Sequence, residues 1–161
     1  MTTDINIDEA WGKLADAGEE ERETQMLRRY TELSSLSEEA RRSRLLAMAK
    51  AEYALSDAKL RPLTLSRMRV WLKIDTETAK KVSDSYGAAM NQMPGPAAMR
   101  RVALVQTLAR EFSIEDQARL AALVPQVFAA KPVVVAKVLS ATASPTPPAS
   151  KKQWWAFWRR S

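Results

Sequence analysis

The sequence predicts an all-α fold: a compact bundle of about six or seven helices, followed by a disordered linker and a short aromatic C-terminal tail. Apolar residues recur at three- and four-residue intervals along most of residues 7–124, which is the spacing of amphipathic helices. Capping residues or proline stand before most of these stripes, and no two segments look like partner strands. With 46% apolar and 27% charged residues among 161, the chain can bury a working core in one domain.

The stretch at 96–112 is predicted to be the central helix of this bundle. Its apolar residues spread around most of a helical wheel, and a helix that is apolar nearly all round is usually the buried one. These residues are Met99, Val102, Ala103, Leu104, Val105, Leu108, Ala109 and Phe112. The other segments each show a single apolar stripe, so we expect them to pack around 96–112.

Two helices are expected before residue 35. Asn6, with Glu9 three residues later, has the pattern of a capping box, and one apolar stripe that includes Trp11 continues until Gly18. Residues 1–19 are therefore interpreted as an acidic N-terminal arm or helix. The next helix opens on glutamates at 19, 20, 21 and 23, where negative charge complements the helix dipole, and it begins a helical domain at 20–139.

The middle of the chain is divided by one proline. The capping box at Ser35–Glu38 predicts a helix that runs to about residue 55. Residues 57–63 are expected to be a connection, because Pro62 interrupts them. A short helix is expected at 64–74.

Three further starts are marked by caps or proline. Asp75 is expected to cap a helix to about residue 92, with the clearest apolar stripe in the chain, and Pro96 to start the helix after the turn at 93–96. Ser113 is expected to cap a helix with Ile114 on its buried side, until Pro125 interrupts it. Residues 132–139 are expected to be a last helix or a strand, since their valines are typical of strands. Helix is favoured because no partner strand is evident.

The composition excludes several kinds of chemistry. The chain has no cysteine and no histidine, so disulfides, thiolate or histidine metal sites and histidine-based triads are excluded. No glycine-rich loop predicts phosphate binding. We expect a protein without a cofactor that is not an enzyme. The acidic residues that remain for acid–base catalysis are Glu52, Asp57, Asp84, Glu111, Glu115 and Asp116, and their spacing singles none of them out.

The net charge of +6 is unevenly distributed. Residues 1–40 hold 4 basic and 11 acidic residues, whereas residues 41–140 hold 17 basic and 8 acidic ones. A basic body with an acidic head predicts either an acidic partner or a head that folds over part of the body. The candidate patch for an acidic partner consists of Arg41, Arg42, Arg44, Arg67, Arg69, Arg100 and Arg101.

The C-terminal tail, residues 151–161, is the main candidate binding segment. It follows a linker at 140–150 that contains three prolines and no large apolar residue, which we expect to be extended. Tryptophan favours the membrane–water interface, and flanking cations attract anionic lipid. The candidate residues are Lys151, Lys152, Trp154, Trp155, Phe157, Trp158, Arg159 and Arg160.

These features favour a non-catalytic interaction or adaptor protein that the tail tethers to a membrane surface or a larger assembly. Since the N-terminus lacks the pattern of a signal peptide and no stretch has 18 consecutive apolar residues, we expect a cytoplasmic protein, peripheral at the inner face of a membrane.

Three alternatives stay open. The tail could fold back onto its own domain, or dock in the groove of a partner protein. The protein could instead be a basic helical nucleic-acid-binding protein that uses the helices at 64–74 and 76–92. That signal is weak, because the turn between them lacks glycine and the second helix offers few base-reading side chains beyond Lys80, Lys81 and Asn91.

Overall fold

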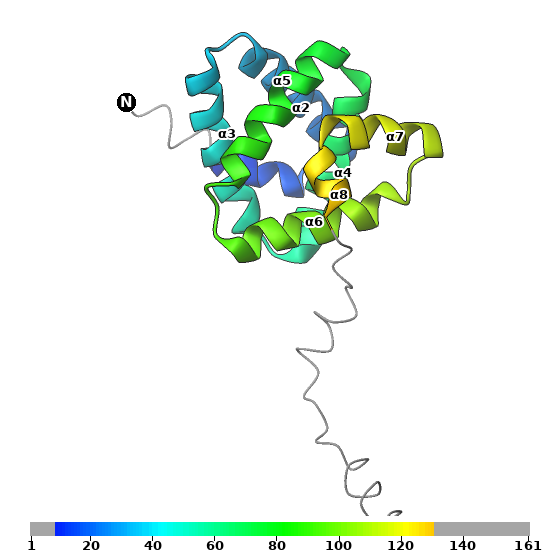
Figure 1. Cartoon of the computed structure of the whole chain (residues 1–161). Coiled ribbons are helices and arrows are strands. Elements are labelled where there is room, and N and C mark those ends of the chain that lie inside the picture. Colours follow the sequence, from blue (N-terminus) through cyan, green and yellow to red (C-terminus); the bar gives the residue numbers. More distant parts are fainter. Residues whose placement is uncertain (1–8, 131–161) are drawn as a thin grey trace, which may run out of the picture.

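The computed structural model describes residues 9–130, which form an all-α bundle, as predicted (Figure 1). Residues 9–13 are helical and end in a 3-10 turn, η1 (Leu14–Asp16). Seven α-helices follow within the described range: α2 (Glu19–Ser34), α3 (Glu38–Tyr53), α4 (Asp57–Lys73), α5 (Thr76–Met90), α6 (Gly95–Ala109), α7 (Ile114–Leu123) and α8 (Pro125–Ala129). The cap at Asn6, the element at 132–139, the linker and the tail lie outside the described residues.

Side-chain caps begin three helices, and the caps at Asp75 and Ser113 are the predicted ones, whereas α3 is capped by Ser37 and not by Ser35, the first residue of the predicted capping box. In α3, α5 and α7 the side-chain oxygen of the capping residue accepts a hydrogen bond from the N–H three residues later. The pairs are Ser37 with Ala40 at 3.3 Å, Asp75 with Thr78 at 2.9 Å, and Ser113 with Asp116 at 3.1 Å. The predicted stripe of α5 is buried as well, at Ala79, Val82, Tyr86, Ala89 and Met90.

The central helix is α4, so the prediction that the bundle is built around 96–112 is wrong. Helix α4 packs against η1 and against α2, α3, α5, α6 and α7. Its buried residues are Leu60, Leu63, Thr64, Ser66, Arg67, Met68, Val70 and Trp71. Helix α6 buries only Arg101, Val105, Leu108 and Ala109, and the Met99 side chain is 58% exposed.

The interpretation of 57–63 as a connection is also wrong, because α4 begins at Asp57 and continues through Pro62. Proline at this position removes one helical N–H, and the carbonyl left without its partner belongs to Ala58. Ala58 is exposed, so water can solvate that carbonyl. Leu60 and Leu63 on either side are fully buried, and their packing favours the continuous helix.

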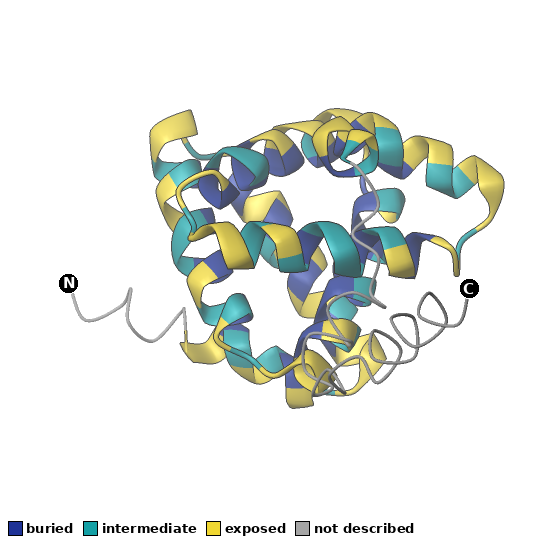
Figure 2. Ribbon diagram, turned by 60° about the horizontal axis from the view of Figure 1, so that its bottom comes forward, coloured by how far each residue is buried: buried dark blue, intermediate teal, exposed yellow. Residues whose placement is uncertain are grey.

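Ile114 does not lie on a buried face as predicted: its side chain is 87% exposed at the first position of α7. The core contacts of α7 come instead from Leu120 and Leu123. The exposed faces of the described helices are visible in Figure 2.

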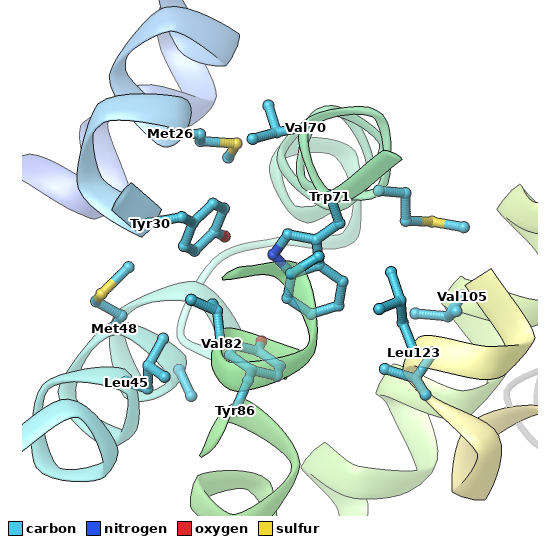
Figure 3. Packing of buried hydrophobic residues seen from close by; sticks show 14 of the residues in the cluster. Met26, Tyr30, Leu45, Met48, Val70, Trp71, Val82, Tyr86, Val105 and Leu123 are labelled. Atoms are coloured by element: carbon cyan, nitrogen blue, oxygen red, sulfur yellow. The ribbon is translucent and has the colours of Figure 1, made fainter. Parts of the chain in front are cut away.

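A chain of four aromatic rings crosses the core, and Figure 3 shows three of them, Tyr30, Trp71 and Tyr86. The ring centroids of Trp11 and Tyr30 are 5.7 Å apart, those of Tyr30 and Trp71 are 6.0 Å apart, and those of Trp71 and Tyr86 are 5.9 Å apart. Tilted and edge-on contacts at these distances are favourable for aromatic pairs. The N-terminal arm is thus packed onto the body at Trp11, whose side chain is 3% exposed.

Candidate functional site

The sequence-predicted binding segment, 151–161, lies outside the described residues, but the point at which the chain leaves the body is defined. The Gln106 amide of α6 donates hydrogen bonds to the carbonyls of Val127 at 2.8 Å and Ala130 at 3.0 Å. Helix α8 packs on α6. The C-terminal segment therefore starts from a fixed position beside α6.

The excess positive charge belongs to the C-terminal segment and not to the body. Residues 9–130 hold 19 basic and 17 acidic side chains, whereas residues 131–161 hold six basic side chains and no acidic one. Most of the chain's net positive charge therefore lies in residues 131–161.

The acidic head folds over part of the body, one of the two interpretations that the charge distribution allowed. Glu19 and Glu23 at the start of α2 form ion pairs with Arg69 of α4, and Glu23 also pairs with Lys73. These contacts pair two of the acidic residues of the head with two cations of the body.

The seven arginines of the candidate patch do not form one free basic surface. Arg67 is 2% exposed and Arg41 is 9% exposed, where the Arg41 guanidinium donates to the Ser85 hydroxyl at 2.8 Å and to the Leu36 carbonyl at 3.0 Å. Burial of Arg67 and Arg41 removes both from any contact with a partner.

Three more of these arginines are paired within the fold, and two remain. Arg42 pairs with Glu38 in the same helix, and Arg69 pairs with the start of α2. Arg100 pairs with Asp57 at 2.8 Å and donates to the carbonyls that end α3. Among the described residues Arg44 is exposed without an ion pair, whereas Arg101 is 8% exposed.

A buried polar cluster joins the N-terminal arm to three helices. Its members are Trp11, Glu52 of α3, Arg67 of α4 and Tyr86 of α5, and Glu52 is 0% exposed. The Glu52 carboxylate pairs with Arg67 and accepts from the Trp11 indole at 2.8 Å and from the Tyr86 hydroxyl at 2.6 Å. Arg67 also donates to Tyr86 at 2.9 Å. Buried ions need such partners, because each costs several kcal/mol to dehydrate.

Burial shifts the pKa values of groups in this cluster and of Tyr30 and Arg101. Burial raises the pKa of the Tyr30 hydroxyl and raises that of Tyr86 well above its usual value, although Arg67 nearby acts in the opposite direction. The pKa of the Arg67 guanidinium is raised: burial lowers it, and the Glu52 carboxylate more than offsets that effect. Burial lowers the pKa of Arg101.

The sequence carried a signal for this cluster that the prediction did not use. Glu52 lies on the same helical face as Leu45, Met48 and Ala49, and Arg67 lies four residues after Leu63. A charged residue in an apolar stripe requires a buried partner of opposite charge. The pairing of Glu52 with Arg67 is nevertheless a tertiary contact that spacing alone does not identify.

The carboxylates that composition left open for catalysis are separated and mostly paired with cations. Asp57 pairs with Arg100, Asp84 with Lys80, Glu111 with Arg61, and Asp116 with Arg119. Glu115 is exposed and Glu52 belongs to the buried polar cluster. In residues 9–130 no three acidic residues are grouped so that they could hold a metal ion.

Helix α5, the recognition helix of the nucleic-acid alternative, has its lysines paired in the same helix. Lys80 lies 3.0 Å from Asp84, and Lys81 lies 3.1 Å from Glu77. The helix therefore presents a nearly neutral outer face.

No helix within 9–130 has the length and apolar character needed to cross a membrane. Comparison of the chain with protein-family models, with curated proteins and with solved structures gives no match. Any function must therefore be inferred from the residues themselves.

Proposed function

We propose that this protein is a non-catalytic interaction protein whose C-terminal tail, residues 151–161, tethers the helical body to an anionic membrane surface at the cytoplasmic leaflet. One observation carries the proposal: three tryptophans and a phenylalanine fall within residues 154–158, between a pair of lysines and a pair of arginines. Such a cluster on a polar linker is costly to leave in water.

The physical basis is the combination of interfacial aromatics with cations. Tryptophan rings lie favourably at the headgroup level, because part of the ring is apolar while the indole N–H stays hydrated. Each cation near an anionic surface adds about 1 kcal/mol of attraction. A tail of this size binds reversibly, so its occupancy depends on lipid charge and salt.

The position of the chain's charge supports the same assignment. The body at 9–130 is nearly neutral, with 19 basic and 17 acidic residues, and its arginines are largely held in internal contacts. The charged side chains of the C-terminal segment, residues 131–161, are all basic. Attraction to an anionic surface is thus concentrated where the tryptophans are.

The test is co-sedimentation with two kinds of vesicle. One is made of neutral lipid, and the other contains about 30% anionic lipid, which gives its surface a clear negative charge. Four chains are compared: the intact chain, a chain ending at Ser150, a variant with Trp154, Trp155, Phe157 and Trp158 replaced by alanine, and a variant with Lys151, Lys152, Arg159 and Arg160 replaced by glutamine. Circular dichroism establishes that the four bodies are equally helical.

We expect the intact chain alone to sediment strongly with anionic vesicles. The alanine variant should lose binding to both vesicle types, and the glutamine variant should lose the preference for anionic lipid. Binding by the chain ending at Ser150 would mean that the body, and not the tail, contacts lipid. Absence of binding by the intact chain would reject the lipid surface, and the tail would then serve as bait for a partner protein.

A further inference from the structure

One buried arginine differs from all the others in its contacts. Arg22 donates hydrogen bonds to three backbone carbonyls and a serine hydroxyl, Arg41 donates to Ser85 and Leu36, and Arg67 pairs with Glu52. Arg101 is equally buried, at 8% exposed, yet has no hydrogen bond or ion pair to any residue within 9–130. Its guanidinium lies over the face of the Tyr86 ring, with 4.9 Å between the guanidinium carbon and the ring centroid.

The charges around Arg101 do not balance. Glu52 is the one carboxylate buried among the described residues, and Arg67 already neutralises it. Arg101 is therefore a second largely buried cation without a buried anion, and its guanidinium nitrogens keep a small contact with solvent. A guanidinium keeps its proton at neutral pH even where burial lowers its pKa, so it cannot escape the cost of burial by becoming neutral.

A narrow cavity opens beside this guanidinium, between α4, α6 and α7. Its wall is otherwise apolar apart from Arg67, and its lining residues are Arg67, Met68, Trp71, Arg101, Val105, Leu120 and Val124. Figure 3 shows Val105, one of these lining residues, on the side of Trp71 away from Tyr30. The space is sufficient for one particle about the size of a water molecule.

We propose that this cavity is a binding site for a small monovalent anion of the size of chloride, held by the Arg101 guanidinium between largely apolar walls. The charge of Arg101 specifies an anion, and the size of the cavity excludes phosphate and sulfate. The site does not depend on the proposed function of the tail.

The test uses the full chain with chloride as the probe, at constant ionic strength maintained with sodium gluconate. The variants are Arg101→Met and, as a matched control, Arg110→Met, because Arg110 is an exposed arginine at the end of the same helix. The measurements are the thermal midpoint as a function of chloride concentration and the line width of the ³⁵Cl resonance. A parallel series with sodium acetate separates a free halide from a carboxylate.

We expect chloride to raise the midpoint of the wild-type chain and of Arg110→Met by roughly 3–8 °C for each tenfold increase above the dissociation constant. The same two proteins should broaden the ³⁵Cl resonance, and Arg101→Met should do neither. An equal response of Arg101→Met, or no response of the wild type, would overturn the site. Stabilisation by acetate without stabilisation by chloride would overturn the size assignment.

A second measurement covers the case in which Arg101→Met does not fold. Crystals of the full chain soaked in bromide should show an anomalous peak within hydrogen-bonding distance of the Arg101 guanidinium. A crystal with bromide peaks elsewhere and none at Arg101 would refute the proposal.

Discussion

The carboxylate of Glu52 and the guanidinium of Arg67 form an ion pair in the interior of the bundle, at 0% and 2% exposure. The two residues come from neighbouring helices, α3 and α4, and the other hydrogen bonds of Glu52 come from the N-terminal arm and from α5. The pair therefore lies where four parts of the chain meet.

Removing one member of this pair should be strongly destabilising. Glu52→Leu or Arg67→Met leaves an uncompensated buried charge, so the free energy of unfolding should fall by about 3–5 kcal/mol. Urea unfolding followed by circular dichroism measures the loss. The double variant Glu52→Leu with Arg67→Met should lose much less than the sum of the single variants. Asp84→Asn is the control, since the exposed Lys80–Asp84 pair contributes only about 0–1 kcal/mol. Additive losses would show that the pair is not coupled.

Trp11→Phe tests the attachment of the N-terminal arm. Phenylalanine fills most of the same space but cannot donate to Glu52, so one buried carboxylate oxygen loses a partner and the free energy of unfolding should fall by about 1–3 kcal/mol. Equilibrium urea unfolding checks this, and limited proteolysis checks whether cleavage near residues 9–17 becomes faster. The contact would be energetically unimportant if Trp11→Phe behaved like the wild type in both measurements.

Stability should fall as the pH rises above about 10. Burial raises the folded-state pKa of Tyr30 and Tyr86, so above pH 10 the unfolded chain releases protons that the folded chain retains. The contribution of these groups is fully present below the unfolded pKa and is lost as the pH rises. Each tyrosine adds a slope of about 1.4 kcal/mol per pH unit.

Unfolding titrations between pH 8 and pH 12, a range chosen to bracket the ordinary tyrosine pKa of about 10, measure this slope. Tyr86→Phe is compared with the wild type, because the comparison cancels contributions common to both chains. The slope should become shallower in Tyr86→Phe even though the variant is less stable. An unchanged slope would mean that Tyr86 ionises in the folded protein as readily as in the unfolded one.

Pro62→Ala should stabilise the protein. Alanine restores the N–H that α4 lacks at this position, and it is a far better residue for a helix interior. The greater freedom of the unfolded chain offsets about 0.4–1 kcal/mol of the gain, so we expect a net increase of about 1–2 kcal/mol in the free energy of unfolding. Pro96→Ala is the matched control, since Pro96 lies in the first turn of α6, where proline is well tolerated, and it should be neutral or slightly destabilising. Equal effects at the two positions would contradict the argument.

The sequence was sufficient wherever structure depends on neighbours along the chain. Asp75 and Ser113 were predictable as caps because the hydrogen bond of each is made three residues away. The stripe of α5 was predictable because an amphipathic helix that packs on one side must follow the helical period.

The central helix was missed because hydropathy does not record polar groups that are paired inside the fold. Helix α4 buries Thr64, Ser66 and Arg67, which look like surface residues until the partners from α2, α3 and α5 are known. Pro62 strengthened the error by suggesting a break. The basic patch was predicted too broadly for the same reason, since the sequence alone does not reveal that Arg67 and Arg41 are buried. The binding residues of the tail remain a prediction.

The chain of aromatic rings in the core gives the protein two separable sets of fluorophores. Trp11 and Trp71 both belong to that chain of rings, while the other three of the five tryptophans lie at 154, 155 and 158. A chain that ends at Ser150 therefore emits from buried indoles only, and Tyr30, between the two, lies close enough to transfer excitation to either one. The spectrum of the intact protein minus that of the shortened one belongs to the tail. Intrinsic emission can thus report unfolding of the body and the proposed binding of the tail to lipid, without an attached dye.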